Sequence, residues 1–430
     1  MLFVKSNEWY EEALRVIPMG ASTFSRSPNF YTIGGAPLCL RSGLGSRVTD
    51  IDGNEFIDYA MALAINTLGY SNWEVAAAAK RAIDDGIIFT LSCPEEMELA
   101  RKIVEVVPCA EMVRFFKNGS DGCEGAVKLA RAVTGREKIV TVGGYHGFHD
   151  WFMASQERNL GVPAALRSLV LPQPYNDIEG IRRTIEKHHM EIAAVIMEPI
   201  ITVEPVPGFL EEIRRLTFLH GIVLIFDEMK TGFRLAIGGA QEYFKVVPDL
   251  AVFAKGLSNG FPLCALTGKR ELMKTFENEK CFMSGSYASE KVSLNAALKT
   301  IEILQRGEVI QHIWKMGEKL KGGIIAIIEL HKLEAVMKVV GLAPMQHIVF
   351  SDYQGHTAIT IKSYLQQECI QRGVLFVGYH HPSFAHSVSD IDLTLTAYEE
   401  AFGLLAEALK ANDLQARLKG QPISPFGVRK

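Results

Sequence analysis

The chain has 430 residues, of which 48% are hydrophobic and 22% are charged, as expected of a soluble globular protein with more than one domain. A net charge of −4 and the lack of a long basic run argue against nucleic-acid binding. The longest apolar stretches are far shorter than the roughly 20 residues of a membrane helix, and the N-terminus shows no secretory signal pattern. The seven cysteines form no CxxC pair, which predicts a reduced, cytoplasmic protein.

The first predicted element is an amphipathic helix over residues 6–17, which ends at Pro18. The segment "SRVTDIDGNEFIDY" predicts a hairpin, because Asp-Gly between two short strand-like stretches is typical of a tight turn. Helices are predicted over 74–85 and 95–106, where apolar residues recur at three- and four-residue spacing.

Five short apolar segments follow, separated by helical stretches: "MVRFFK", "KIVTVGG", "IAAVIMEPI", "GIVLIFDEM" and "DLAVFA". Apolar strands that alternate with helices predict an α/β fold, with a parallel sheet covered on both faces. We therefore expect a large α/β domain over residues 72–300. Residues 1–71 form an N-terminal segment, and residues 301–430 are expected to form a smaller α+β domain.

Polar residues follow these strands, and ligands bind beyond the carboxyl ends of strands in parallel sheets. "NGSDGCEG" follows the first strand, and backbone amides at such a helix start, with the Ser120 hydroxyl, suit a phosphate. Helix capping explains the same residues equally well. In "YHGFHDW", Tyr145 is suited either to lie against a planar ligand or to pack in a loop. His146 and His149 lack a third ligand at metal-like spacing, which argues against a metal site.

Carboxylates and an amine end the remaining strands. Asp227 and Glu198 each either bond to loop backbone or pair with a cation, such as the ring nitrogen of a heteroaromatic cofactor. Lys255 ends an apolar strand, where desolvation favours its neutral form, and a neutral amine forms a Schiff base with an aldehyde. A phosphate cup, an aromatic residue, a carboxylate and an amine together match the parts of pyridoxal 5′-phosphate (PLP).

Four segments, "FDEMKTGFR", "AKGLSNGFPL", "NGSDGCEGAVKLARAVTGREKIV" and "YHGFHD", resemble the class III aminotransferases, which are PLP-dependent enzymes of fold type I. The similarity runs from about Trp9 to Leu405. Within that family, "VTDIDGNEFIDY" and "FAHSVSDIDLTL" resemble the glutamate-1-semialdehyde 2,1-aminomutase group. The resemblance implies a large, mainly parallel-sheet domain and a smaller α+β domain built from the N- and C-terminal segments.

The resemblance also implies site residues. Lys255 would carry PLP as a Schiff base and later move the substrate proton, and Asp227 would pair with the pyridinium nitrogen. Tyr145 would stack on the ring with His146 beside it. The complete implied cofactor set is Gly119, Ser120, Tyr145, His146, Glu198, Asp227, Lys255 and Ser286.

Two further residues bear on assembly and substrate. Ser286 falls where the family has a threonine that reaches the phosphate of the neighbouring subunit, which implies a homodimer with shared sites. Arg26 falls where the aminomutase has an arginine for the substrate carboxylate, and a solvated loop arginine is an equal interpretation.

The chain departs from the aminomutase pattern in two places. The Gly/Ser-rich segment after the "YHG" motif is "DWFMASQERNLGVP" here, and the lysine loop lacks a run of three glycines. These changes favour an aminotransferase that moves an amino group between a small-molecule amino donor and a small carbonyl compound or sugar derivative. Pyridoxamine 5′-phosphate would be the alternate cofactor form. The alternative is the aminomutase itself, an isomerase that transfers the amino group within one molecule.

Two other classes remain as rivals. A nicotinamide-dependent dehydrogenase would also use an α/β sheet, but no G-x-G-x-x-G opens a helix with an acid about 20 residues later. A non-catalytic binding protein with the PLP fold is the second rival, and the intact Lys255 and Asp227 argue against it.

Overall fold

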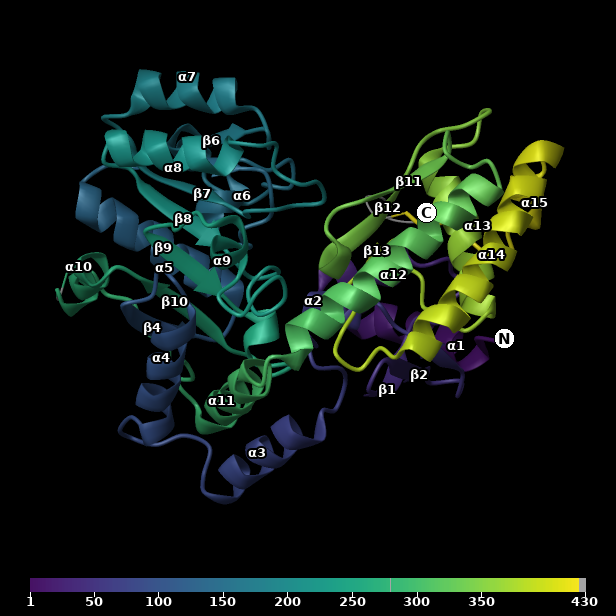
Figure 1. Cartoon of the computed structure of the whole chain (residues 1–430), viewed down its shortest axis with the longest axis horizontal. Coiled ribbons are helices and arrows are strands. Elements are labelled where there is room, and N and C mark those ends of the chain that lie inside the picture. The colour runs from purple at the N-terminus through teal and green to yellow at the C-terminus, as the bar shows by residue number, and fades with distance from the viewer. Residues whose placement is uncertain (279, 425–430) are drawn as a thin grey trace. The chain divides into compact units, whose positions relative to one another are not determined.

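The computed structural model describes residues 1–278 and 280–424. The chain forms two compact units (Figure 1). Among the described residues, unit 1 contains 1–63, 68–72 and 311–424, and unit 2 contains 64–67, 73–278 and 280–310. Unit 1 therefore combines segments from the two terminal parts of the chain, while unit 2 is built from its middle.

Unit 2 is built on a seven-stranded sheet in the order β4-β10-β9-β8-β7-β5-β6. Its strands are β4 (Met112–Phe116), β5 (Lys138–Val142), β6 (Val170–Gln173), β7 (Ile192–Met197), β8 (Val223–Asp227), β9 (Leu250–Phe253) and β10 (Cys264–Gly268). β10 pairs antiparallel with β4 and β9, and the remaining pairs are parallel. The predicted α/β class with a mainly parallel sheet is confirmed.

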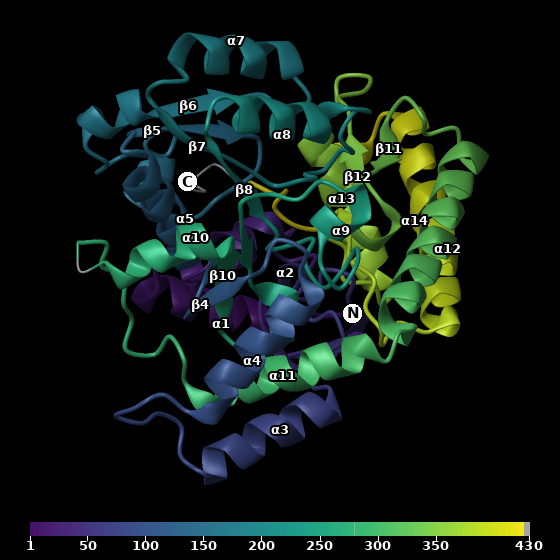
Figure 2. The ribbon, with the colours of Figure 1, turned by 60° about the vertical axis from the view of Figure 1, so that its left-hand side comes forward.

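Continuous apolar sequence explains why the central strands lie inside. Every residue of β7, β8 and β9 is buried, which requires cover on both faces of the sheet. Figure 2 shows α5, α7 and α8 around this sheet. The helices of unit 2 are α3 (Trp73–Asp84), α4 (Pro94–Val106), α5 (Gly119–Thr134), α6 (Asp150–Met153), α7 (Ile178–His188), α8 (Phe209–Leu219), α9 (Ala240–Phe244), α10 (Arg270–Met273) and α11 (Lys291–Gln305).

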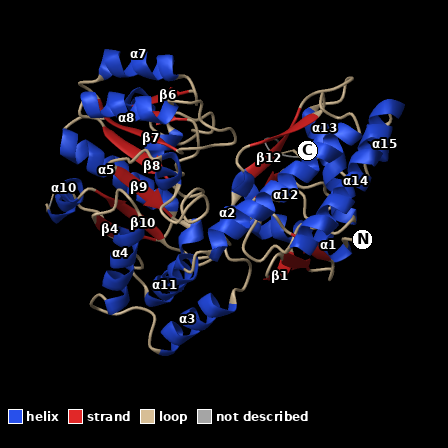
Figure 3. Ribbon diagram, in the orientation of Figure 1, coloured by secondary structure: helices blue, strands red, loops and turns tan. Residues whose placement is uncertain are grey.

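Unit 1 contains two small antiparallel sheets and long helices (Figure 3). The strands are β1 (Leu40–Leu44), β2 (Arg47–Asp50) and β3 (Glu55–Ile57) in one sheet, and β11 (Met337–Val340), β12 (Gln346–Phe350) and β13 (Tyr379–His380) in the other. The helices are α1 (Val4–Val16), α12 (Glu308–Leu330), α13 (Ala358–Gln371), α14 (Val388–Ala411) and α15 (Leu414–Arg417). The short α2 (Met61–Ala64) has positive φ at all four residues.

The core of unit 1 is centred on α14. A capping box formed by Ser387 and Asp390 caps the N-terminus of this helix. Tyr398 and Phe402 of this helix are fully buried among apolar residues of α12 and α13, such as Leu320 and Leu365. None of the helices in the described part of the chain has the length and apolar character needed to cross a bilayer.

Most predicted elements are confirmed. The helix expected at 6–17 is α1, the Asp-Gly hairpin is β2–β3, and the five apolar segments are β4, β5, β7, β8 and β9. Two strands of the large sheet, β6 and β10, were not expected. The division into residues 1–71, 72–300 and 301–430 stays a prediction.

Candidate active site

The predicted site residues of unit 2 lie where strands of the large sheet end. β4, β9, β8, β7 and β5 run in one direction, so their carboxyl ends lie along one edge of the sheet. The residues at or just after these ends are Gly119 and Ser120 after β4, Tyr145 and His146 after β5, Glu198 after β7, Asp227 at the end of β8 and Lys255 after β9.

Asp227 and His146 form a buried pair at this edge. His146 Nδ1 lies 2.8 Å from Asp227 Oδ2, and both side chains are almost entirely excluded from solvent. The backbone amide of Met229 donates to Asp227 Oδ1 at 3.1 Å, and the thiol of Cys123 approaches Oδ2 at 3.8 Å. The carboxylate is therefore fixed in position. Nothing in the sequence had indicated that His146 bonds to Asp227 directly.

Glu198 joins three strand ends. Its Oε1 accepts a hydrogen bond from the backbone amide of Tyr145 at 2.9 Å, and its Oε2 lies 2.5 Å from the ammonium of Lys230. Burial raises the pKa of Glu198, but the Lys230 charge opposes this strongly enough that the pKa ends below its ordinary value. The Tyr145 ring packs edge-on against Phe152 and is 57% exposed. Its outer face is therefore open to a ligand.

Lys255 opens a 3₁₀ turn directly after β9, in a left-handed conformation with φ of +49°. A non-glycine residue in this region stores strain, which clusters at functional sites. Burial lowers the pKa of Lys255, and the nearby charge of Lys230 lowers it further, while Glu198 and Asp227 oppose the shift. Within the described residues its amine makes no hydrogen bond or ion pair.

The start of α5 forms a cradle. Asn118 caps the helix by accepting a hydrogen bond from the Asp121 amide, and the first amides of any helix lack an intrahelical acceptor. A Cβ at Gly119 would lie 1.8 Å from the sulfur of Met229, so a larger residue there would force the Met229 side chain to move. Gly147, with φ of +114°, brings its backbone so close that a Cβ would lie 2.6 Å from Ser120 Oγ. Such a cradle suits a phosphate.

Arg234 belongs to the same region and was not predicted. Its side chain is fully buried, and burial lowers its pKa to about 10. Its guanidinium lies 3.4 Å from the carbonyl oxygen of Ala64 and 3.5 Å from Thr67 Oγ1. Its charge is one of those that lower the pKa of Lys255. The motif "KTGFR" was part of the recognised family pattern, but no spacing rule singles out its arginine.

The histidines of "YHGFHD" do not act together. His149 Nε2 lies 3.2 Å from Asp121 Oδ1, whereas His146 bonds to Asp227. In the part of the chain that the structure describes, no group of three or more potential metal ligands is found.

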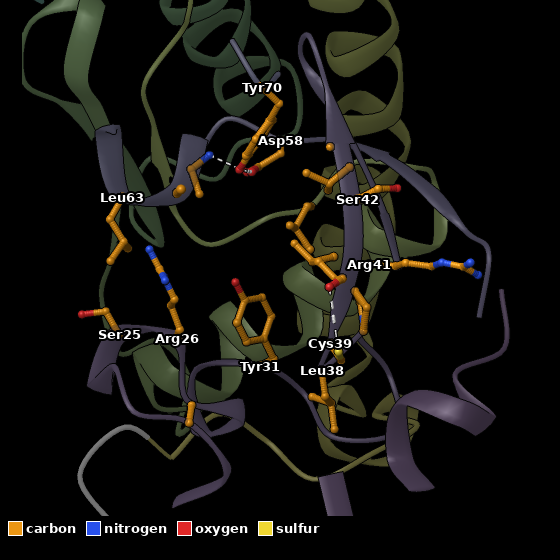
Figure 4. Close-up of a pocket in the computed structure, with 18 of the residues that line it drawn as sticks. Ser25, Arg26, Tyr31, Leu38, Cys39, Arg41, Ser42, Asp58, Leu63 and Tyr70 are labelled. Atoms are coloured by element: carbon orange, nitrogen blue, oxygen red, sulfur yellow. Dashed lines mark hydrogen bonds between the residues drawn. The ribbon is translucent and has the colours of Figure 1, made fainter. Parts of the chain in front are cut away.

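The two remaining predicted site residues are Ser286, in unit 2, and Arg26, in unit 1. Ser286 is exposed in the loop before α11. Arg26 lines a cavity of about 570 Å³ in unit 1. Figure 4 shows Arg26 and Tyr31 pointing into this hollow, with the hydrogen-bonded pair of Asp58 and Tyr70 across it. Most of the remaining lining is apolar or aromatic, namely Trp9, Ile17, Ala21, Pro37, Leu38, Leu40, Val48, Ala60, Ala62, Leu63, Leu375 and Tyr379.

These features fit PLP. The glycine cradle at Ser120 suits the phosphate, the fixed carboxylate of Asp227 suits a protonated ring nitrogen, and the open face of Tyr145 suits the ring. The partnerless amine of Lys255 suits the aldehyde. His146 Nε2 is buried without a hydrogen-bond partner among the described residues, as expected where an additional group belongs.

Known proteins resemble this chain over most of its length. Residues 32–400 match the family model "Aminotransferase class-III". A glutamate-1-semialdehyde 2,1-aminomutase of Methanosphaera stadtmanae is 32% identical over 92% of this chain and 98% of its own length. A 3-aminobutyryl-CoA aminotransferase of Cloacimonas acidaminovorans is 33% identical over 94% and 98%. The structure of the PLP internal aldimine form of the Sphingopyxis sp. MTA144 FumI protein aligns with a TM-score of 0.88, 30% identity and coverage of 94% and 97%.

The predicted fold type, enzyme class and PLP cofactor are thereby confirmed. The family model covers the whole lysine loop, the Asp227 strand and the helix that begins at Gly119, which are the parts that form the sheet-edge site. The chain belongs to the class III aminotransferases.

Proposed function

We propose that this protein transfers an amino group between two separate molecules, with Lys255 as its catalytic residue. One observation carries the role of Lys255: a largely buried amine without a partner among the described residues stands at the sheet edge, where the carboxylate of Asp227 is also fixed. A neutral amine in such a place is both a nucleophile and a base.

When bound, PLP supplies an aldehyde and a ring that accepts an electron pair. Lys255 would hold the aldehyde carbon through its amine, with the aldehyde oxygen lost as water, and once an amino donor had displaced it the free amine would be the base for the proton on the donor carbon. Asp227 would hold the ring nitrogen in its protonated form, and His146 holds Asp227 in place. Gly119 and Ser120 would hold the phosphate. None of these steps distinguishes transfer between molecules from transfer within one.

The cavity of unit 1 supports a substrate that carries a carboxylate. Among the described residues, the side chain of Arg26 makes no hydrogen bond or ion pair, so its planar guanidinium is available for bidentate binding of a carboxylate. Apolar and aromatic side chains dominate the rest of the lining. This favours a small apolar keto acid or amino acid over the sugar derivative that the sequence left open.

The aminomutase reaction is the second candidate. Two of the curated relatives, from Methanosphaera stadtmanae and Methanosarcina acetivorans, are glutamate-1-semialdehyde 2,1-aminomutases at 32% and 33% identity. The relative from Cloacimonas acidaminovorans, an aminotransferase, is equally similar at 33%. The altered segment after "YHG" favours transfer between two molecules.

We also propose a cytoplasmic homodimer in which Ser286 reaches the neighbouring subunit's phosphate site. All seven cysteines are free in the structure, as expected of a protein kept in a reducing compartment. The segment at 83–91 exposes Ile87, Ile88, Phe89 and Leu91, and the amide of Lys291 donates to the Ile87 carbonyl at 2.8 Å. This apolar surface therefore adjoins the start of α11, five residues after Ser286. A second copy of the chain is the occupant we propose for it.

A half-reaction assay tests the proposed function. Purified protein loaded with PLP is mixed with a panel of amino acids and amines that includes glutamate, and conversion to pyridoxamine 5′-phosphate is followed by absorbance. We expect conversion with at least one donor. Borohydride followed by peptide mass mapping should place the cofactor on Lys255. A Lys255→Ala protein that retained the native rate would disprove the mechanism.

Glutamate 1-semialdehyde separates the two candidate reactions. We expect slow or no formation of 5-aminolevulinate, together with net transfer from the donor found above to a keto acid. Efficient formation of 5-aminolevulinate without an external donor would assign the protein to the aminomutases.

A further inference from the structure

A second lysine, Lys230, lies at the same edge of the sheet as Lys255. It follows Asp227 by three residues, in the loop after β8, and β8 is the neighbour of both β7 and β9. Its ammonium lies 2.5 Å from Oε2 of Glu198, and its side chain is only 29% exposed. Because Glu198 also accepts the amide of Tyr145, the ion pair holds the Lys230 charge at a fixed place in the site.

The loop that carries Lys230 packs directly on the turn that carries Lys255. A Cβ at Gly256 would lie 3.3 Å from the carbonyl oxygen of Gly232 and 3.6 Å from Cβ of Phe233. The two lysines therefore belong to backbone segments in van der Waals contact.

We propose that Lys230 is a positioning residue that keeps a fixed positive charge beside Lys255 and so maintains the Lys255 amine in its neutral, nucleophilic form. The inference rests on the function proposed above. Lys230 acts through Lys255 and is not itself required to react with substrate.

Five charged or titratable groups face this region, namely Glu198, Asp227, Lys230, Arg234 and His146. The two carboxylates favour the charged form of Lys255, and each of them is already paired, Asp227 with His146 and Glu198 with Lys230. The two cationic side chains disfavour it. A lysine beside another cation is a recognised way to activate an amine.

Trace acetylation of the cofactor-free protein tests this charge effect without any catalytic assay. Acetic anhydride reacts only with neutral amines, so the pH dependence of labelling at Lys255, measured by peptide mass spectrometry, gives the pKa of that residue. In Lys230→Met we expect labelling near pH 7 to fall about tenfold, which corresponds to a rise of about 1 in the pKa. Lys230→Arg should label like the native protein.

Two further variants complete the design. Glu198→Gln removes a carboxylate that favours the ammonium form, so labelling of Lys255 should become faster, the opposite of the Lys230→Met result. A general loosening of the site would instead shift both variants in the same direction. Lys269→Met is the matched control, because Lys269 is also ion-paired, to Asp249 at the amino end of β9, and labelling of Lys255 should not change.

The outcomes separate this inference from the proposed function. Unchanged labelling of Lys255 in Lys230→Met, or slower labelling in both Lys230→Met and Glu198→Gln, would overturn the role of Lys230 even if the protein transaminates. Suppose that labelling of Lys255 is slower in Lys230→Met and faster in Glu198→Gln, but the protein fails every half-reaction. That result would support the role of Lys230 and overturn only the proposed function.

Discussion

The carboxylate of Asp227 receives three donors, from His146, from the Met229 amide and from the Cys123 thiol. These contacts fix the position of the carboxylate. In the proposed reaction it is the negative charge of Asp227, rather than its position alone, that keeps the ring nitrogen protonated. Asp227→Asn keeps the shape and removes the charge. We expect the rate of the half-reaction to fall about 100-fold or more, in the range of other preorganised electrostatic contacts. Single-turnover absorbance measurements on the cofactor-loaded variant would check this.

A matched control lies at the opposite edge of the same sheet. Asp249, just before β9, is buried and ion-paired with Arg214 and Lys269. Asp249→Asn should lower the free energy of unfolding but leave the single-turnover rate unchanged. Equal loss of rate in both variants would mean that Asp227 matters only for folding.

At the scale of single residues, sequence reasoning found the side chains that follow strands but not their partners. Asp227, Glu198 and Lys255 stand out in sequence because each ends an apolar run. The bonds of His146 to Asp227 and of Lys230 to Glu198 join different strand ends. These contacts form only because the strands lie in a particular order in the sheet, and the local sequence around each residue does not indicate that order.

At the scale of elements, two glycines of α12 illustrate how packing decides a substitution. A Cβ at Gly317 would lie 2.2 Å from the carbonyl oxygen of Ala343, whereas a Cβ at Gly322 would meet nothing within 4 Å. Gly322→Ala should stabilise the protein by about 0.5–1 kcal/mol, because alanine favours the helix. Gly317→Ala should destabilise the protein by roughly 1–3 kcal/mol, because the backbone at Ala343 would have to move away from the new methyl group and would be strained.

Urea unfolding of both variants, followed by circular dichroism, measures the difference. The two positions share one helix, so helix propensity contributes equally. Stabilisation by Gly317→Ala would show that α12 and the turn at Ala343 do not touch as the structure has them.

The unexpected strands β6 and β10 mark the limit of pattern reasoning for elements. β6 contains Pro172, which argues against a strand in sequence, and the structure places it at the edge of the sheet, where proline is tolerated. β10 is the short run "CALTG" after a glycine-rich loop, and it lies antiparallel between β9 and β4. The five strands expected from the sequence are no longer than β10 as a group, but each follows or precedes a helical stretch and so fits the alternation of strand and helix.

At the scale of the whole molecule, the buried His380 of unit 1 makes stability depend on pH. Burial, together with His347 and His386, lowers the pKa of His380 to about 3, and its Nε2 lies 2.7 Å from the Tyr398 hydroxyl. The unfolded chain protonates this group near pH 6.5. Between pH 6.5 and 3 the unfolded state therefore binds the extra proton, so stability is lost as the pH falls below 6.5.

The contribution of His380 is measured by difference. The free energy of unfolding in urea should fall between pH 7.5 and 5.5, by up to about 1.4 kcal/mol per pH unit below 6.5 for this group. His380→Gln should flatten that slope. Parallel slopes for the native protein and His380→Gln would show that His380 is already charged in the folded state.

Assembly is the last property that belongs to the whole molecule. The segment with the exposed apolar side chains at 87–91 adjoins the start of α11, near Ser286, through the bond between Ile87 and Lys291, and exposed apolar surface of this kind is typical of an interface. If two copies meet here, a charge at Phe89 separates them and leaves each phosphate site without the partner's Ser286. Phe89→Lys should therefore shift the protein from dimer to monomer in light scattering and weaken PLP binding at least tenfold. Phe218→Lys, at an exposed phenylalanine on α8, is the control and should change neither property. A Phe89→Lys protein that stays dimeric would place the interface elsewhere, and a monomer with native PLP affinity would exclude Ser286 from the site.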